Sequence, residues 1–207
     1  NKIPIDCRVE NYITHPEWRA SSRNYRSRIG QERRNIKYMV QHWDAALSSK
    51  SCLSILERKN ISCHLLLDNS GLLIQACDLQ NVCYHAGARR WNNDSIGIEV
   101  SNAFYMRYQN HYIKKGFGPR PIVENCFVHG KKLEKHLGFY EVQKTTLRAL
   151  YRCLEKNLNI PLQTPENRTI NQDVRNGKFR GHVHHFHLTE SKIDSGSYDI
   201  QAQFEKI

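Results

Sequence analysis

A predicted β-hairpin at residues 62–75 limits the folds open to this chain. Residues 62–67 (SCHLLL) have the composition of a strand, and the turn sequence DNSG follows at 68–71. Residues 72–75 (LLIQ) would form the second, antiparallel strand of the hairpin. Residues 36–41 and 95–100 also have strand composition and alternation. Helical patterns at 44–59 and 141–158 are interspersed with these strands, which predicts a single α/β domain.

Two segments lie outside this pattern. Residues 1–35 are polar and rich in arginine, and we expect an N-terminal extension lying on a domain that spans residues 36–207. Residues 101–140 are rich in Tyr, Lys, Gly and Pro with little periodicity, which predicts a long irregular insertion. Long loops of this kind are often functional, so we expect both segments to shape or gate a cleft.

The charge is strongly positive, with 31 Lys and Arg against 20 Asp and Glu. Such a balance suits a polyanionic partner, either nucleic acid or an anionic cell-wall polymer. The chain has no zinc-finger spacing, RNP-like aromatic strand or helix-turn-helix pattern, so nucleic acid is the less favoured partner. The longest apolar runs, such as residues 65–67, are far too short for a transmembrane segment.

The cysteine pattern bears on the compartment. Seven cysteines are present and none forms a CxxC pair, which argues against a zinc ribbon and a complete disulfide framework. A reducing, cytoplasmic compartment is therefore slightly favoured, although one or two disulfides remain compatible with the count. The chain opens on Asn1 and not on a methionine, so a removed leader, and with it a periplasmic or secreted location, stays open.

Residues 181–187 (GHVHHFH) are the densest chemical signal in the chain. A histidine cluster at a strand end, followed by the loop carboxylate Asp194, supplies ligand types that suit Zn²⁺. His42 directly follows the strand 36–41 and could complete such a site. Strand alternation places Glu99 on the face opposite Ile96, Ile98 and Val100, where it is either exposed to solvent or part of a site.

Four sequence blocks resemble the zinc amidases that include phage amidase-lysozymes, bacterial cell-wall recycling amidases and animal peptidoglycan recognition proteins. They are the strand YMVQH at 38–42, the hairpin SCHLLLDNSG at 62–71, the pair YHAG at 84–87 with NDSIGIE at 93–99, and the end containing Lys192, Asp194 and Gly196. The resemblance covers about residues 36–200. It implies an amidase-like α/β fold with a central mixed β-sheet flanked by helices.

The resemblance implies His42, His184 and Asp194 as zinc ligands, with His185 as the alternative to His184. His184 fits the family's spacing to Lys192 and Asp194 without a gap, although Val183 stands where the family usually has Gly. Three protein ligands would leave a fourth position for water, as in a catalytic zinc site.

The implied reaction is zinc-dependent hydrolysis of the amide between N-acetylmuramic acid and L-alanine in peptidoglycan or muropeptides. Glu99 would be the general base and Lys192 the oxyanion-stabilising group. Cys63 stands where some relatives carry an assisting Tyr, so Glu99 would act without it. Residues expected to line the substrate cleft are His85, Arg89, Trp91 and Asn93. The alternative is a non-catalytic peptidoglycan-binding module of the same fold.

Overall fold

A six-stranded mixed β-sheet forms the centre of the computed structural model, which describes residues 4–207. Its order is β1 (Val9–Asn11), β5 (Leu73–Gln75), β4 (Leu65–Leu67), β7 (Ser95–Val100), β3 (Tyr38–Trp43) and β12 (Gly181–His184). The strands β4, β7, β3 and β12 run parallel, whereas β5 is antiparallel to β4 through the predicted hairpin. The predicted α/β fold with a mixed sheet is therefore confirmed.

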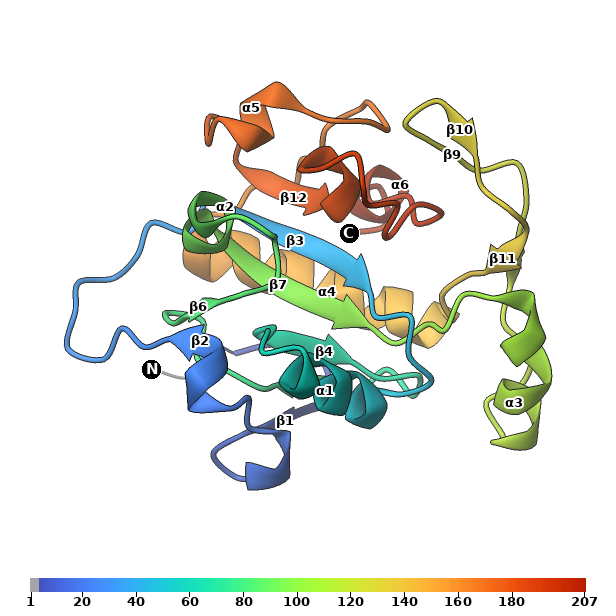
Figure 1. The fold of residues 1–207 in the computed structure, drawn as a ribbon, viewed down its shortest axis with the longest axis horizontal. Helices are drawn as coiled ribbons and strands as arrows, with labels where there is room; N and C mark the ends of the chain where they lie inside the picture. Colours follow the sequence, from blue (N-terminus) through green and yellow to red (C-terminus); the bar gives the residue numbers. More distant parts are fainter. Residues whose placement is uncertain (1–3) are drawn as a thin grey trace.

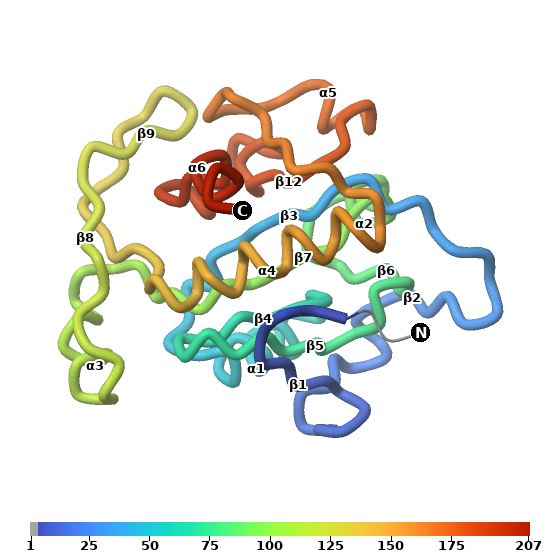
Figure 2. The backbone as a smooth tube through the Cα atoms, turned by 180° about the vertical axis from the view of Figure 1, so that it is seen from behind, coloured from blue at the N-terminus to red at the C-terminus, as the bar shows by residue number. Residues whose placement is uncertain are grey.

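Helices cover both faces of this sheet (Figure 1). The long helix α4 (Glu141–Leu158) lies behind β3 and β7 in Figure 1 and in front of them in Figure 2. Its residues Leu147, Leu150 and Leu154 pack against Ile96 and Ile98 of β7 in the larger hydrophobic core. On the opposite face, α1 (Ser49–Arg58) packs through Cys52 and Leu56 against the hairpin residues Leu66 and Ile74.

Between these layers every residue of β3 is buried, and in β7 Glu99 alone is partly exposed. Short helices α2 (Arg89–Asp94), α5 (Gln172–Arg175) and α6 (Gln201–Phe204) and a two-stranded sheet of β2 (Tyr25–Arg26) and β6 (Val82–Cys83) complete the domain. Because parallel strands end at a common edge, side chains that follow β3, β7 and β12 can meet there.

The insertion at 101–140 is more ordered than its sequence predicts. It contains α3 (Gln109–Lys114) and two small antiparallel pairs, β8 (Ile122–Val123) with β11 (His136–Leu137) and β9 (Phe127–Val128) with β10 (Lys131–Lys132). These strands have two residues each, too few for any alternation to be visible in the sequence. In the ribbon of Figure 1 and the tube of Figure 2 the insertion lies at one end of the molecule.

One buried arginine fastens the insertion to the domain. The Arg120 guanidinium lies between the rings of Tyr112 and Tyr140, at 4.2 and 4.3 Å from their centres. It donates hydrogen bonds to the carbonyl oxygens of Ser101 (2.8 Å) and Gly138 (3.0 Å) and to the Asn69 side chain. This role could not be predicted from the sequence, because an isolated arginine in a basic chain usually lies at the surface.

The predicted N-terminal extension contributes to the sheet. β1 pairs in parallel with β5 at the sheet edge, and the Trp18 indole donates a 2.7 Å hydrogen bond to Glu10. The strand has only three residues, one of them apolar, so its pattern is too short to recognise. Residues 1–3 of the predicted extension lie outside the described residues, and the division at residue 35 stays a prediction.

The described residues contain no helix that is both long and apolar enough to cross a bilayer. All seven cysteines lie in the described part of the chain, and each is a free thiol there.

Candidate metal centre

Three side chains converge at the carboxyl edge of the sheet. His42 belongs to β3, His185 opens a 3₁₀ helix directly after β12, and Asp194 lies in the following loop. The Nδ1 atoms of His42 and His185 are 3.0 Å apart, and they lie 2.9 and 3.1 Å from Asp194 Oδ2. All three residues are buried.

The donor set fits a zinc ion. Ligand atoms at tetrahedral zinc lie roughly 3.3 Å from one another when the bonds are about 2.0 Å long, close to the spacing of these three atoms. Two imidazole nitrogens 3.0 Å apart cannot both donate or both accept a hydrogen bond. Hydrogen bonds alone therefore satisfy the contacts among these three atoms poorly. A cation bound to both lone pairs and to the carboxylate would satisfy all three atoms.

The protonation states also suit a metal. Burial, reinforced by His185, lowers the pKa of His42 to about 4, so its imidazole is neutral at neutral pH. Burial alone would raise the pKa of Asp194, but His185 and His42 outweigh it and hold that pKa well below its usual range. A neutral imidazole and an ionised carboxylate are the forms that coordinate zinc.

The residue that joins His42 and Asp194 is His185, the alternative ligand, and not His184. Parallel pairing sets His184 beside Gln41, so His184 points to the α4 face, away from His42. There its Nδ1 lies 2.9 Å from the Ser195 hydroxyl. The 3₁₀ helix at His185–His187 then turns the next residue toward His42. Motif spacing favoured His184 because spacing along one strand carries no information on the register with its neighbour.

Glu99 lies beside the triangle on the same face of the sheet. The β3–β7 register pairs it with His42, and Ile96, Ile98 and Val100 point into the α4 core as the alternation predicts. Burial, followed by the charges of Asp44 and Asp194, raises the pKa of Glu99 well above its usual range. A carboxylate with a raised pKa is a stronger base than an ordinary carboxylate, which suits it to accept a proton.

Lys192 lies in the exposed loop that carries Asp194. It is close enough for its charge to oppose protonation of His42 and to favour ionisation of Glu99. The positive charge of Lys192 therefore lies near Glu99, the other predicted catalytic residue.

His85 is buried beside His42, on the Nε2 side of that ring. Its Nδ1 is 3.2 Å from His42 Nε2, and its Nε2 is 3.2 Å from the Ser95 hydroxyl, which donates a 2.6 Å hydrogen bond to the Trp91 carbonyl. If His42 Nδ1 carries no hydrogen and can bind a metal, one assignment of the protons satisfies every hydrogen bond in this series. His42 Nε2–H donates to His85, His85 Nε2–H to Ser95, and Ser95 to Trp91. The part that Ser95 plays in this series of hydrogen bonds could not be predicted from the sequence.

Gly97 is the residue that makes room for this arrangement. A Cβ atom there would lie 2.6 Å from His85 Cγ and Nδ1 and 2.7 Å from Cys63 Sγ. The neighbouring Asn92 also holds the segment, because its side-chain oxygen accepts from the backbone N–H groups of His85 and Ala86. The YHAG and NDSIGIE blocks therefore meet at one buried contact.

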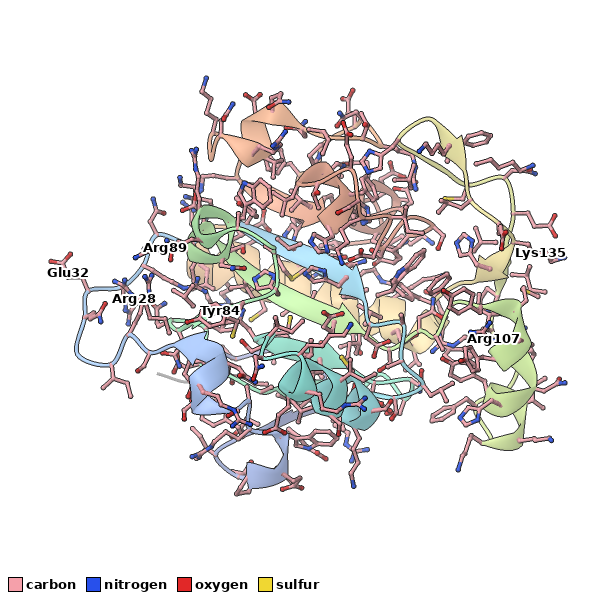
Figure 3. The ribbon with its side chains drawn as sticks, in the orientation of Figure 1. Arg28, Glu32, Tyr84, Arg89, Arg107 and Lys135 are labelled. Atoms are coloured by element: carbon pink, nitrogen blue, oxygen red, sulfur yellow. The ribbon has the colours of Figure 1, made fainter. Side chains whose placement is uncertain are left out.

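The other residues predicted to bind substrate have varied surroundings. The Trp91 indole donates to the Arg175 carbonyl (3.2 Å), and Asn93 Oδ1 accepts a 2.6 Å hydrogen bond from Arg26. Both side chains thus connect α2 to neighbouring segments. Arg89 is exposed, and Figure 3 shows it on α2, at the opposite end of the molecule from Arg107 and Lys135 of the insertion.

Comparisons with solved structures identify the same fold. The catalytic domain of XlyA superposes with a TM-score of 0.53 at 16% identity, covering 91% of this chain and 90% of that one. The Ph2119 endolysin from a Thermus scotoductus bacteriophage gives a TM-score of 0.52 at 14% identity, covering 96% of this chain and 98% of that one. No curated protein gave a significant match.

A family model extends across most of the domain. The model described as N-acetylmuramoyl-L-alanine amidase, Amidase_2, matches residues 32–197. This range includes His42, His185 and Asp194 and ends just after the loop that carries Lys192. With the fold, the histidine–aspartate cluster and the family match in agreement, this chain belongs to the Amidase_2 family of N-acetylmuramoyl-L-alanine amidases.

Proposed function

We propose that this protein is a zinc-dependent amidase that cleaves the bond between N-acetylmuramic acid and L-alanine in peptidoglycan or its muropeptides. The observation that carries the proposal is the convergence of His42, His185 and Asp194 beside Glu99 of the adjacent strand. A recognition module of the same fold needs neither a complete ligand set nor a partly buried carboxyl with a raised pKa next to it.

His42, His185 and Asp194 would hold the zinc ion. When bound, zinc polarises a carbonyl group and lowers the pKa of water toward about 7. His85 keeps His42 in the tautomer with a free Nδ1, because His85 Nδ1 accepts the proton on His42 Nε2. The ligand is thus oriented before the substrate arrives.

Glu99 moves the proton in the reaction. Its carboxylate accepts a proton from the attacking water and, as an acid of raised pKa, returns that proton to the leaving nitrogen of L-alanine. Lys192 stabilises the negative charge that develops on the carbonyl oxygen, which is an electrostatic contribution made chiefly in the transition state. Because Cys63 is buried and its pKa is raised by burial, this thiol stays protonated and takes no acid–base part.

The test is digestion of purified muropeptides followed by mass spectrometry. The wild type should release intact stem peptides beginning at L-alanine, and dipicolinate should abolish the release until zinc is restored. Glu99→Gln should lower kcat by about 100- to 10,000-fold, the range typical of a general base. Glu32→Gln, a change at an exposed residue far from the cluster, is the matched control and should behave as wild type.

Two outcomes would contradict the proposal. Binding of muropeptide without cleavage, in zinc-loaded protein, would identify a recognition module. Full activity of Glu99→Gln would remove the proton-transfer role from this residue.

A further inference from the structure

Each of the three converging ligands has a direct sequence neighbour in a second polar cluster. These neighbours are Gln41, His184 and Ser195, which adjoin His42, His185 and Asp194 respectively. Gln41 and His184 are partners in the β3–β12 pairing, so their side chains lie on the same face of the sheet, the α4 face. Ser195 contacts both of them there. We call Gln41, His184 and Ser195 the neighbour cluster.

Ser195 is the centre of the neighbour cluster. Its hydroxyl accepts a 3.0 Å hydrogen bond from the Gln41 side-chain amide and lies 2.9 Å from His184 Nδ1. Because a hydroxyl carries one hydrogen and can also accept, it can accept from Gln41 and donate to His184 at the same time. The Ser195 side chain is thus held by one residue of β3 and one residue of β12.

Hydrogen bonds continue from the neighbour cluster to α4. The Gln41 side-chain oxygen accepts a 2.7 Å hydrogen bond from the Tyr151 hydroxyl, which lies 3.4 Å from the Tyr198 hydroxyl. The backbone N–H of Tyr198 in turn donates to the Ser195 carbonyl at 3.1 Å. These contacts return to Ser195, so both its hydroxyl and its carbonyl are held.

The neighbour cluster is buried and its hydrogen bonds are complete. Gln41 and Ser195 are 0% exposed and His184 is 4% exposed, so an unpaired polar atom there would be costly. Within residues 4–207, no buried polar side-chain atom of the neighbour cluster lacks a hydrogen-bond partner. The ligand triangle differs, because hydrogen bonds alone satisfy its contacts poorly. The neighbour cluster is therefore complete without a metal and can hold the ligands in place before zinc binds.

We propose that Ser195, held by Gln41 and His184, is a positioning residue for Asp194. The inference rests on the proposed function in that Asp194 is taken as a zinc ligand. Metal ligands must be held within roughly 0.5 Å of the productive geometry. Because Asp194 and Ser195 are adjacent, any shift of Ser195 moves the Asp194 carboxylate relative to the two histidine ligands. His184 thereby acts on the metal centre through Ser195 and is not itself a ligand.

The first test compares Ser195→Ala with Thr146→Val. Each substitution removes one buried hydroxyl, but the Thr146 hydroxyl donates to the Gly71 carbonyl of the β4–β5 hairpin at 2.7 Å and has no contact with the neighbour cluster. Zinc affinity is measured by competition with a chromophoric chelator, and the stability of the zinc-free protein is measured by urea unfolding. Turnover of purified muropeptides gives kcat and KM for the zinc-saturated protein.

Ser195→Ala should weaken zinc affinity by about 10-fold, the lower end of the range for side chains that hold metal ligands. It should also lower kcat and leave KM unchanged, because a fully buried side chain cannot touch the substrate. Thr146→Val should lower the urea midpoint, as Ser195→Ala does, but should keep the zinc affinity of the wild type. Wild-type zinc affinity in Ser195→Ala, or the same loss in Thr146→Val, would overturn the inference.

The second test separates positioning from ligation at residue 184. In His184→Asn, the side-chain amide can take the place of Nδ1 beside Ser195, so most of the zinc affinity should remain. His184→Leu loses this contact and should weaken zinc affinity by about 10-fold, as Ser195→Ala does. His185→Asn removes a ligand and should lose far more. A loss in His184→Asn as large as that in His185→Asn would identify His184 as a ligand and refute its positioning role.

Zinc affinity is measured without substrate, so this inference and the proposed activity fail separately. If the wild type cleaves no muropeptide while the zinc-affinity loss in Ser195→Ala persists, the proposed activity fails and the positioning role stands. If the wild type cleaves muropeptides and Ser195→Ala binds zinc as tightly as the wild type, the positioning role fails alone.

Discussion

His85 provides the sharpest test of the metal centre, because it contacts a predicted ligand without being one. In the wild type, His85 Nδ1 lies 3.2 Å from His42 Nε2, and the His85 residue is only 8% exposed. The variant His85→Ala removes this acceptor for the proton on His42 Nε2. His42 is then free to adopt the other tautomer, in which Nδ1–H donates to Asp194 Oδ2 and no longer offers its lone pair. Loss of such an outer hydrogen bond typically weakens metal affinity by about 10- to 100-fold, or about 1.4 to 2.7 kcal/mol.

The assay is competition for zinc against a chromophoric chelator at pH 7.5. His85→Asn should recover much of the affinity, because its side-chain oxygen can accept where the imidazole Nδ1 did. His182→Leu is the control: it also removes a buried imidazole, but one that packs between Tyr151 and Phe204. Unchanged zinc affinity in His85→Ala, or an equal loss in His182→Leu, would refute the proposed orientation of His42.

Three further predictions concern the supporting structure. Gly97→Ala should lower the free energy of unfolding in urea by about 1–3 kcal/mol and weaken zinc binding, because the added Cβ would overlap His85 and Cys63. Burial lowers the pKa of His182 to about 3, so between pH 6.5 and 3 the unfolded chain binds more protons there and stability falls as pH falls. His182→Leu should therefore flatten the decline in urea midpoint between pH 6 and 4, and an unchanged slope would contradict this. Arg120→Met should cost about 3 kcal/mol or more, because buried carbonyl oxygens lose their donor, and limited proteolysis should then cut within 101–140 first.

Much of the fold follows from the sequence because its signals are local. Turn residues DNSG, alternation along 95–100 and the helical spacing of Leu147, Leu150 and Leu154 each report on neighbours within one element. The same alternation correctly separated Glu99 from the core-facing Ile98. The two-residue strands of the insertion and the three-residue β1 carry too few side chains for such a signal.

The site was less predictable because it depends on relations between elements. His184 and His185 are adjacent in sequence, and only the register of β12 against β3 decides which of them faces His42. The same holds for His85, whose contact with His42 depends on the absence of a side chain at Gly97. Arg120 donates hydrogen bonds to the backbone carbonyl oxygens of Ser101 and Gly138, and residue type alone does not reveal such contacts.

The placement of β3 has a consequence for how the centre opens. All six residues of β3 are paired with β7, and its first four are also paired with β12, so its amides should exchange with solvent only on global unfolding. Asp194 instead belongs to a loop whose link to the sheet is made by side chains: the Ser195 hydroxyl accepts a 3.0 Å hydrogen bond from Gln41 of β3 and lies 2.9 Å from His184 Nδ1 of β12. The cluster therefore joins two ligand positions of different kinds. Displacement of the buried segment 194–196 would remove Asp194 from the cluster, while the backbone pairing of β3 and β7 would keep His42 and Glu99 in place.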